Sequence, residues 1–138
     1  MIMLMNNIVG KVWIIFGNKR GDNIMKIGDE LQDDIIFYLS EDGISGLIAM
    51  KNDLPGEYKW DNAITACNEL GNGYRLPNKE ELNLLYQQMH IIGGFANSNY
   101  WSSTRFVSSF AWGQYFGNGI QLNYYKYTTM CVRAVRAF

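Results

Sequence analysis

The first half of the chain alternates apolar runs with polar turns in a way that predicts strands. Residues 8–16 are rich in β-branched and aromatic side chains, which favour a strand. Two further apolar runs, residues 35–39 and 46–50, flank the polar turn 40–43 and predict a β-hairpin.

A first helix is predicted over residues 61–70. Ile64, Cys67 and Leu70 recur at helical spacing, and Asp61 stands where an N-cap residue is expected. Because Cys67 lies on this apolar stripe, we expect a buried free thiol rather than a reactive one.

A second helix is predicted over residues 79–90. Asn78 precedes it and Glu81 follows three residues later, which resembles a capping box. Its apolar stripe is predicted to enter the core and consists of Leu82, Leu85, Tyr86 and Met89.

The chain returns to strands after Gly93 and Gly94. Strands are predicted at residues 100–104, 111–116, 120–122 and 132–136. The order of strands, two helices and strands predicts an α+β fold with the helices packed on an antiparallel sheet. We expect the strand at 8–16 to pair near 132–136, which brings the two ends of the chain together.

The length and the net charge of the chain limit the classes of function to consider. A chain of 138 residues fits one domain, residues 1–138, and its formal net charge is -1 without a Lys/Arg cluster. We therefore expect no binding to nucleic acid or to an anionic membrane surface. The apolar N-terminus is too short and interrupted for a membrane span, and it lacks the basic region of a clear signal peptide.

Few residues suit metal or catalytic chemistry. Cys67, Cys131 and His90 are the cysteines and the histidine, and they show no zinc-ligand spacing. Every Asp and Glu lies before residue 82, where a solvated surface is expected rather than a general acid and base. We expect no metal, no cofactor and no enzyme activity.

Residues 106–131 have the composition of a recognition surface. They contain no Asp or Glu, Lys126 is their one basic residue, and Tyr, Phe, Ser, Thr, Gly and Asn dominate. Tyrosine offers large amphipathic contact area at low entropic cost, and the small polar residues adapt their hydrogen bonding. We therefore predict a surface that binds a ligand.

Several motifs resemble those of a bacterial domain family found at cell surfaces and in phage. They are GYRLPNKEELNLLY at 73–86, YWSST at 100–104, AW at 111–112, FGNG at 116–119 and VRAVR at 132–136. The resemblance covers residues 27–138, leaves residues 1–26 outside, and implies a C-type-lectin-like fold related to formylglycine-generating enzymes. The cysteine pattern of those enzymes and the carboxylates of calcium lectins are missing here, so neither activity is expected.

Some members of this family are the variable proteins of diversity-generating retroelements, and the resemblance implies the same role here. In these systems mutation at adenines turns Asn codons into many others, but never into Gln, Glu, Lys, Met or Trp codons. The candidate variable region is residues 105–131, within which Trp112, Gln114, Gln121 and Lys126 would be constant. The candidate surface is predicted to share one exposed face and consists of Phe106, Val107, Ser108, Ser109, Phe110, Tyr115, Ile120, Leu122, Tyr124, Tyr125, Tyr127, Thr128 and Thr129.

Four residues within or beside the candidate variable region are predicted to be structural. Trp101 and Trp112 are expected as core anchors, and Arg133 or Arg136 is expected to pair with a buried carboxylate or carbonyl.

The resemblance also implies a macromolecular partner, a protein or a surface glycan, met on a phage particle or a bacterial surface. Two alternatives remain open from the sequence. One is a structural or adhesive domain of surface proteins or pili that is not diversified, and the other is a degenerate enzyme-like domain.

Overall fold

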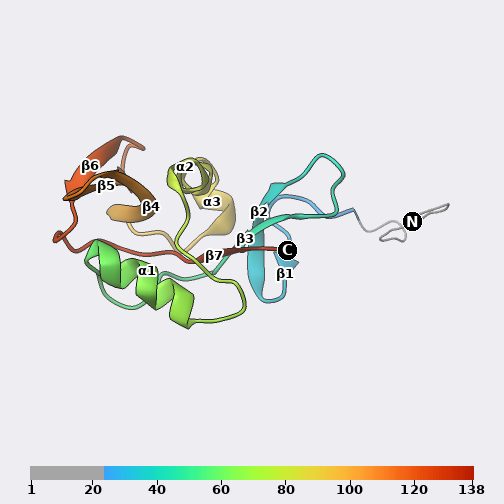
Figure 1. Ribbon diagram of the computed structural model, residues 1–138. Helices are drawn as coiled ribbons and strands as arrows, with labels where there is room; N and C mark the ends of the chain where they lie inside the picture. Colours follow the sequence, from blue (N-terminus) through green and yellow to red (C-terminus); the bar gives the residue numbers. More distant parts are fainter. Residues whose placement is uncertain (1–23) are drawn as a thin grey trace.

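The computed structural model describes residues 24–138 as a mixed α and β domain, as the element order predicts (Figure 1). The predicted strand at residues 8–16, and its pairing with 132–136, lie outside the described residues. The elements in chain order are β1 Glu30–Leu31, β2 Asp34–Leu39, β3 Gly46–Ala49, α1 Trp60–Glu69, α2 Lys79–Gln87, α3 Met89–Ile92, β4 Asn99–Val107, β5 Phe110–Tyr115, β6 Gln121–Tyr125 and β7 Val135–Ala137.

The strands form two antiparallel sheets where the sequence predicted one. In the described residues one sheet has the order β1-β2-β3-β7 and the other the order β4-β5-β6. The sheets lie at opposite ends of the domain, with α2 and α3 between them and α1 below the β4-β5-β6 sheet in this view (Figure 1). The predicted hairpin is present as β2 and β3, which pair from Ile35 with Ala49 to Leu39 with Gly46.

The segment between β6 and β7 explains why the sheet is divided. The backbone of Met130 bonds to Tyr58, and the backbone carbonyl of Val132 accepts from Leu54, whereas Cys131 bonds to β4 through Asn99 and Trp101. Successive residues therefore bond to opposite sides, so this stretch joins the two halves without continuing either sheet. The predicted strand at 132–136 is reduced to β7 for this reason.

The two long helices begin differently. Helix α2 has the predicted capping box, in which the Glu81 N–H donates to Asn78 Oδ1 at 2.8 Å and the Asn78 N–H donates to Glu81 Oε1 at 2.9 Å. Helix α1 begins one residue earlier than predicted, and its N-cap is Lys59 without a side-chain cap. Asp61 is therefore not the cap, but it lies in the first turn, where a negative charge is favourable.

Helix α2 ends earlier than predicted. Gln88 leaves the helical conformation, and its side-chain amide donates to the Phe37 carbonyl at 3.0 Å. The short helix α3 then follows, so residues 79–90 form two helices rather than one.

Two apolar clusters form the core on either side of β4. Trp101 is buried with Trp60, Cys67 and other residues beneath α1, and the neighbouring Tyr100 is buried with Leu82 and others beneath α2. Consecutive residues of a strand point to opposite faces, so one strand supplies an anchor to each cluster. The predicted burial of Cys67 and Trp101 is confirmed.

Trp112 is not the core anchor that the sequence predicted. It is only partly buried, with the Lys79 Nζ 3.5 Å from its ring centroid and the Phe106 ring packed edge-on at 5.8 Å. It lies on the face of β5 opposite Gly113, which is the face that is turned away from Trp101.

Replacing Trp101 by Ala is expected to lower the free energy of unfolding by about 3–5 kcal/mol, because a large buried side chain leaves a cavity. The matched substitution Trp112→Ala is expected to cost clearly less, since that ring is partly exposed. Urea unfolding of both variants measures the difference, and equal costs would contradict this assignment of the two rings.

The acid stability is expected to depend on Glu81. Arg75 donates to both Glu81 oxygens at 2.7 and 2.9 Å. Burial alone would raise the pKa of Glu81, but the bonds from Arg75 and the Asn78 N–H outweigh it and lower the pKa below its ordinary value. A lowered folded-state pKa contributes stability that is complete above the unfolded value of about 4.3 and is lost as the pH falls through the folded value.

Glu81→Gln retains the shape of the cap but removes this charge. The wild type is therefore expected to lose stability more steeply than the variant below about pH 4.3, so that their unfolding free energies converge in acid. Denaturation measured from pH 7 to pH 2 tests this, and two parallel curves would exclude the predicted contribution.

Candidate ligand-binding surface

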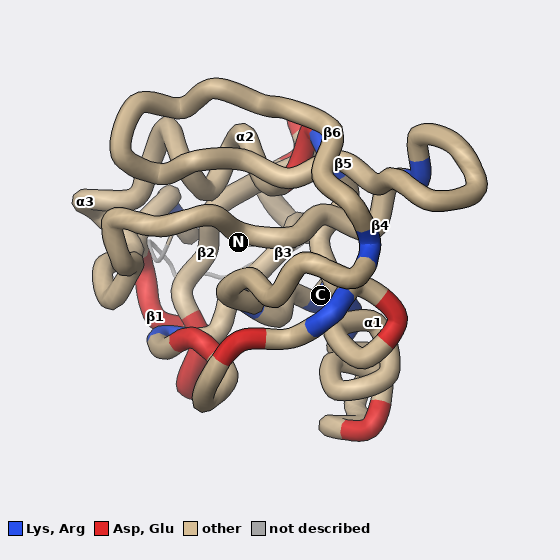
Figure 2. Tube along the Cα trace, turned by 90° about the vertical axis from the view of Figure 1, so that its left-hand side faces the viewer, with Lys and Arg blue, Asp and Glu red and all other residues tan. Residues whose placement is uncertain are grey.

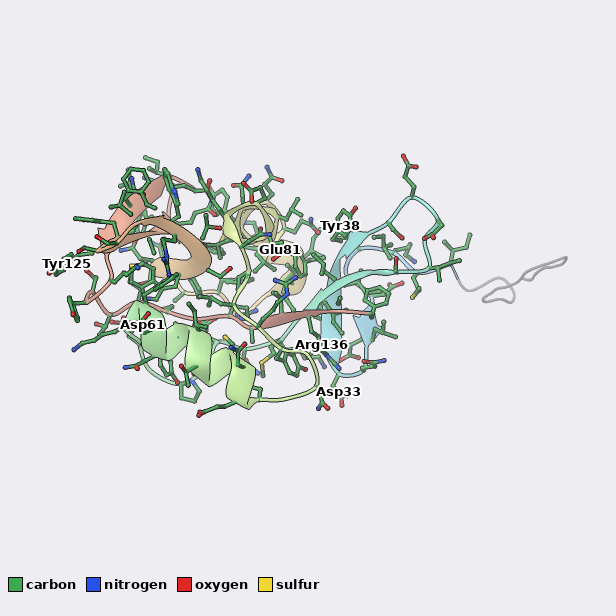
Figure 3. All side chains as sticks on the ribbon, viewed as in Figure 1. Asp33, Tyr38, Asp61, Glu81, Tyr125 and Arg136 are labelled. Carbon is green, nitrogen blue, oxygen red and sulfur yellow. The ribbon has the colours of Figure 1, made fainter. Side chains whose placement is uncertain are left out.

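The candidate surface lies at the end of the domain formed by β4, β5 and β6. Phe106 and Val107 end β4, Ser108 and Ser109 form the turn to β5, and the remaining residues follow on β5, on β6 and in the turns beside them. All of them are exposed except Tyr115 and Tyr124, which are partly buried. Tyr125 projects from this end of the molecule, far from Tyr38 on β2 (Figure 3).

The register of β5 and β6 places the candidate surface on two faces of the sheet. Phe110 pairs with Tyr125, and Gly113 pairs with Leu122 without a register shift between them. Since side chains alternate along a strand, Phe110 and Tyr125 lie on one face, and Leu122 and Tyr124 lie on the other. The expectation of a single shared face is therefore wrong, because it ignored the two-residue period of β6.

One face carries an exposed group of rings, which we call the aromatic patch and define as Phe106, Phe110, Tyr125 and Tyr127. Phe110 packs on Tyr125 with ring centroids 5.6 Å apart, and Tyr125 packs on Tyr127 at 5.3 Å. Phe106 reaches this face through its contact with Trp112. Tyr127 is 66% exposed and Phe106 51% exposed, and contiguous exposed apolar surface of this kind marks interaction sites.

The other face is tied to the core. The Tyr124 hydroxyl donates to Asn99 Oδ1 at 3.0 Å, and its ring packs edge-on against Trp101 at 6.3 Å. Burial raises the pKa of Tyr124, so its hydroxyl stays protonated and can donate. Leu122, 51% exposed, leaves the same face open at the outer edge of the sheet.

Four cations surround this end of the domain, and each lies over a ring. Lys59 lies 5.6 Å from the Tyr127 centroid, Lys79 lies over Trp112, and Lys126 and Arg105 approach Trp60 at 4.4 and 6.0 Å. Within residues 24–138 the ion pairs involve other cations, so these four charges are not neutralised by a carboxylate contact.

The carboxylates at the same end lie outside β5 and β6, and they include Asp61 and Glu80 in the first turns of α1 and α2. Glu57 contacts the region through a hydrogen bond from Thr129 at 3.3 Å. Strands β5 and β6 carry no charged residue, and Figure 2, which faces this end, shows both strands in tan. The surface is therefore apolar at its centre and charged at its margin.

A buried amide network supports β5 and β6 from the side of α2. Gln114 is fully buried, and its amide donates to Asn83 Oδ1 and to the Gly119 carbonyl, both at 2.9 Å. Gln121 donates to the Lys79 carbonyl at 2.9 Å and to Gln114 Oε1 at 3.2 Å. Both glutamines were expected to be constant, and both hold the strands on the helix.

Lys126 joins the end of β6 to the β4–β5 turn. Its Nζ donates to the Ser108 carbonyl at 2.9 Å and its backbone N–H donates to the Ser109 carbonyl at 2.9 Å. The β4–β5 turn is thereby held against the end of β6.

Arg133 has the structural role that the sequence predicted. It is fully buried, its Nε donates to Asp53 Oδ1 at 2.8 Å, and its Nη1 donates to the Met50 and Gly93 carbonyls. Burial and then the Asp53 carboxylate raise the pKa of Tyr100, whose hydroxyl donates to Asp53 Oδ2 at 2.6 Å.

The prediction that the carboxylates form a solvated surface is wrong for Asp34. This residue is 4% exposed, accepts from the Tyr74 hydroxyl at 2.6 Å and pairs with Arg136 at 3.4 Å. No signal in the sequence distinguishes Asp34 or Asp53 from the exposed acids, because their partners lie 40 or more residues away.

The two thiols lie in different environments. Cys67 is fully buried, and burial raises the pKa of its thiol to about 12. Cys131 is partly buried, and burial is the main cause that raises the pKa of its thiol. Neither environment favours the thiolate that nucleophilic chemistry requires.

Among the described residues no group of three or more His, Cys, Asp and Glu side chains is arranged to hold a metal ion. In the same part of the chain, none of the helices combines the length and apolar character that crossing a bilayer requires.

An open hollow lies at the other end of the domain, beside β1. Ile24, Met25, Leu31 and Ile36 are among its lining residues. It lies on the β1-β2-β3-β7 sheet, away from the candidate surface, and none of the candidate surface residues lines it.

Comparison with known proteins identifies the family. No curated protein matches the chain. The Lcl C-terminal domain family matches residues 39–136, which extend from the end of β2 through both core clusters and the candidate surface into β7. Because this match covers more than half of the chain, the protein belongs to the Lcl C-terminal domain family.

Proposed function

We propose that this protein recognises a macromolecular ligand, a protein or a surface glycan, through the candidate surface. In this proposal the chain is one domain with a C-type-lectin-like fold, and residues 105–131 are the variable region of a diversity-generating retroelement. The protein would then act on a phage particle or a bacterial surface, as the resemblance to variable proteins implies.

The observation that carries the proposal is the difference in exposure between two classes of residue within one short segment. The residues that adenine mutation of an Asn codon can produce include the exposed Phe110, Tyr125 and Tyr127. Gln114 and Met130 cannot arise from such a codon, and both are buried. Ala111 and Phe116 can arise from one and are buried as well, but neither belongs to the candidate surface. This distribution is consistent with a candidate surface whose side chains vary, while Gln114 and Met130 beneath it stay constant.

Recognition rather than catalysis is the function we propose. The aromatic patch offers large rings for contact, and a few central aromatic residues supply most of the energy at typical interfaces. The unneutralised cations at its margin would steer a ligand that carries negative charge.

The sequence of the surrounding DNA tests the diversification directly. A retroelement requires a near-identical template repeat close to the gene, with adenines at the codon positions where the two copies differ. We expect these differences to fall on the codons of the candidate surface and to spare those of Trp101, Trp112, Gln121 and Lys126. A gene without such a repeat would favour the alternative, a surface or pilus domain that is not diversified.

Simultaneous replacement of the aromatic patch and Leu122 by Ser is expected to leave the melting temperature nearly unchanged. The reason is that these side chains are exposed, and exposed substitutions typically change stability by about 0.5 kcal/mol or less each. Thermal unfolding followed by circular dichroism measures the effect, with Trp101→Ala as the control that must destabilise. Unfolding of the multiple variant at room temperature would show that this surface is part of the core and end the proposal.

A further inference from the structure

Strand β6 leaves one edge of its sheet open. Within residues 24–138 it pairs with β5 alone, and β5 separates it from β4. An edge of this kind presents a row of backbone N–H and C=O groups that another strand can bond.

The hydrogen bonds at the two ends of the β5–β6 ladder show which backbone groups of β6 point away from β5. The Tyr115 N–H donates to the Ile120 carbonyl at 3.0 Å, and the Lys126 N–H donates to the Ser109 carbonyl at 2.9 Å. Antiparallel pairs alternate between bonded and non-bonded, so Leu122 and Tyr124 also bond inward to β5.

The backbone groups of Gln121, Asn123 and Tyr125 therefore point away from β5. The Tyr125 carbonyl already accepts from the Thr128 N–H at 2.8 Å. The N–H groups of all three residues and the carbonyls of Gln121 and Asn123 remain for a further strand.

This edge lacks the features that usually block pairing. Strand β6 contains no charged residue and no proline, and its register with β5 is continuous. Leu122 is 51% exposed and Tyr125 49% exposed. Natural edge strands are commonly protected by charge, proline or a bulge, so an unprotected edge within a candidate binding surface suggests a use.

The division of the candidate surface between two faces of the sheet also favours a ligand that binds at the edge of β6. A ligand lying flat on one face reaches Tyr125 but not Leu122, whereas a strand added at the edge places its own alternating side chains beside both. We propose that β6 binds an extended segment of a partner polypeptide by β-strand addition. This inference rests on the proposed recognition function and names the form of its ligand.

The charges near β6 indicate the chemistry of that segment. Lys126 directly follows Tyr125, and Lys59 lies over the Tyr127 ring, both outside the ion pairs of the described residues. Glu57 contacts this region through Thr129, and Asp61 follows Trp60 in the first turn of α1. The partner segment would therefore be apolar where it lies beside Leu122 and would carry carboxylates beside Tyr125.

Two substitutions at one position separate the backbone from the side chain. Asn123→Pro removes an outward N–H without removing a bond to β5, and proline is tolerated on an edge strand in that orientation. Asn123→Ala keeps the N–H, and it deletes an amide whose buried Oδ1 has no hydrogen-bond partner in the structure. Both variants are expected to fold, which circular dichroism checks.

The probe is a random library of 12-residue linear peptides, selected for binding to the full-length wild-type protein. We expect the selected peptides to be rich in β-branched and acidic residues and poor in proline. Asn123→Pro is expected to weaken their binding by about tenfold or more, and Asn123→Ala by less than about threefold.

Amide hydrogen exchange of the wild type supplies a second measurement that needs no substitution. The Gln121 and Asn123 amides are expected to exchange rapidly in the free protein and to become protected when a selected peptide binds. Protection in the free protein at low concentration would show that residues 1–23 cover the edge, and protection that appears with concentration would show pairing between copies. Either result overturns the inference.

Failure of this inference is distinguishable from failure of the proposed function. Peptides or glycans whose binding is lost in Tyr127→Ala but kept in Asn123→Pro would leave recognition by the aromatic patch intact and exclude strand addition. A library that yields no binder to the edge would also overturn the inference, while leaving the genetic test of diversification unaffected.

Discussion

The structure depends on an ion pair between the fully buried Arg133 and the partly buried Asp53. The Arg133 side chain is fully buried, and Asp53 accepts from its Nε at 2.8 Å and from the Tyr100 hydroxyl at 2.6 Å. The same guanidinium donates to the Met50 carbonyl and lies 3.8 Å from the centroid of the Phe95 ring. Because removing one partner of such a pair leaves a buried charge uncompensated, the chain segments that meet here are held in one arrangement.

The position of this ion pair allows the side chains of the candidate surface to change without changing the fold. Tyr100 and Arg133 lie on either side of residues 105–131, so both ends of that segment are attached to the core at the same place. Gly94 permits the close packing: a Cβ there would approach the Lys51 carbonyl oxygen to 2.5 Å, and its φ of +78° favours glycine. With its ends held and Gln114 buried beneath it, the segment can vary in exposed side chains at little cost to stability.

Local patterns in the sequence predicted the helices, the hairpin and the α+β class, because capping and periodicity act over a few residues. The capping box at Asn78 is one example. Contacts between distant residues cannot be predicted from such local patterns. Nothing near Asp53 in the sequence indicates its hydrogen bond with Arg133, 80 residues away. The composition of residues 106–131 located the exposed segment but not the faces of its strands, because turn lengths decide the register of β5 and β6.

The measurement that tests this account most directly is a double-mutant cycle on Arg133 and Asp53, followed by urea unfolding. Arg133→Met and Asp53→Asn are each expected to lower the free energy of unfolding by about 3–5 kcal/mol, because each leaves a charge without its partner. The double variant is expected to lose clearly less than the sum of the two, as coupled partners do. Single effects below about 1 kcal/mol that add independently would contradict the claim that this pair anchors both ends of residues 105–131.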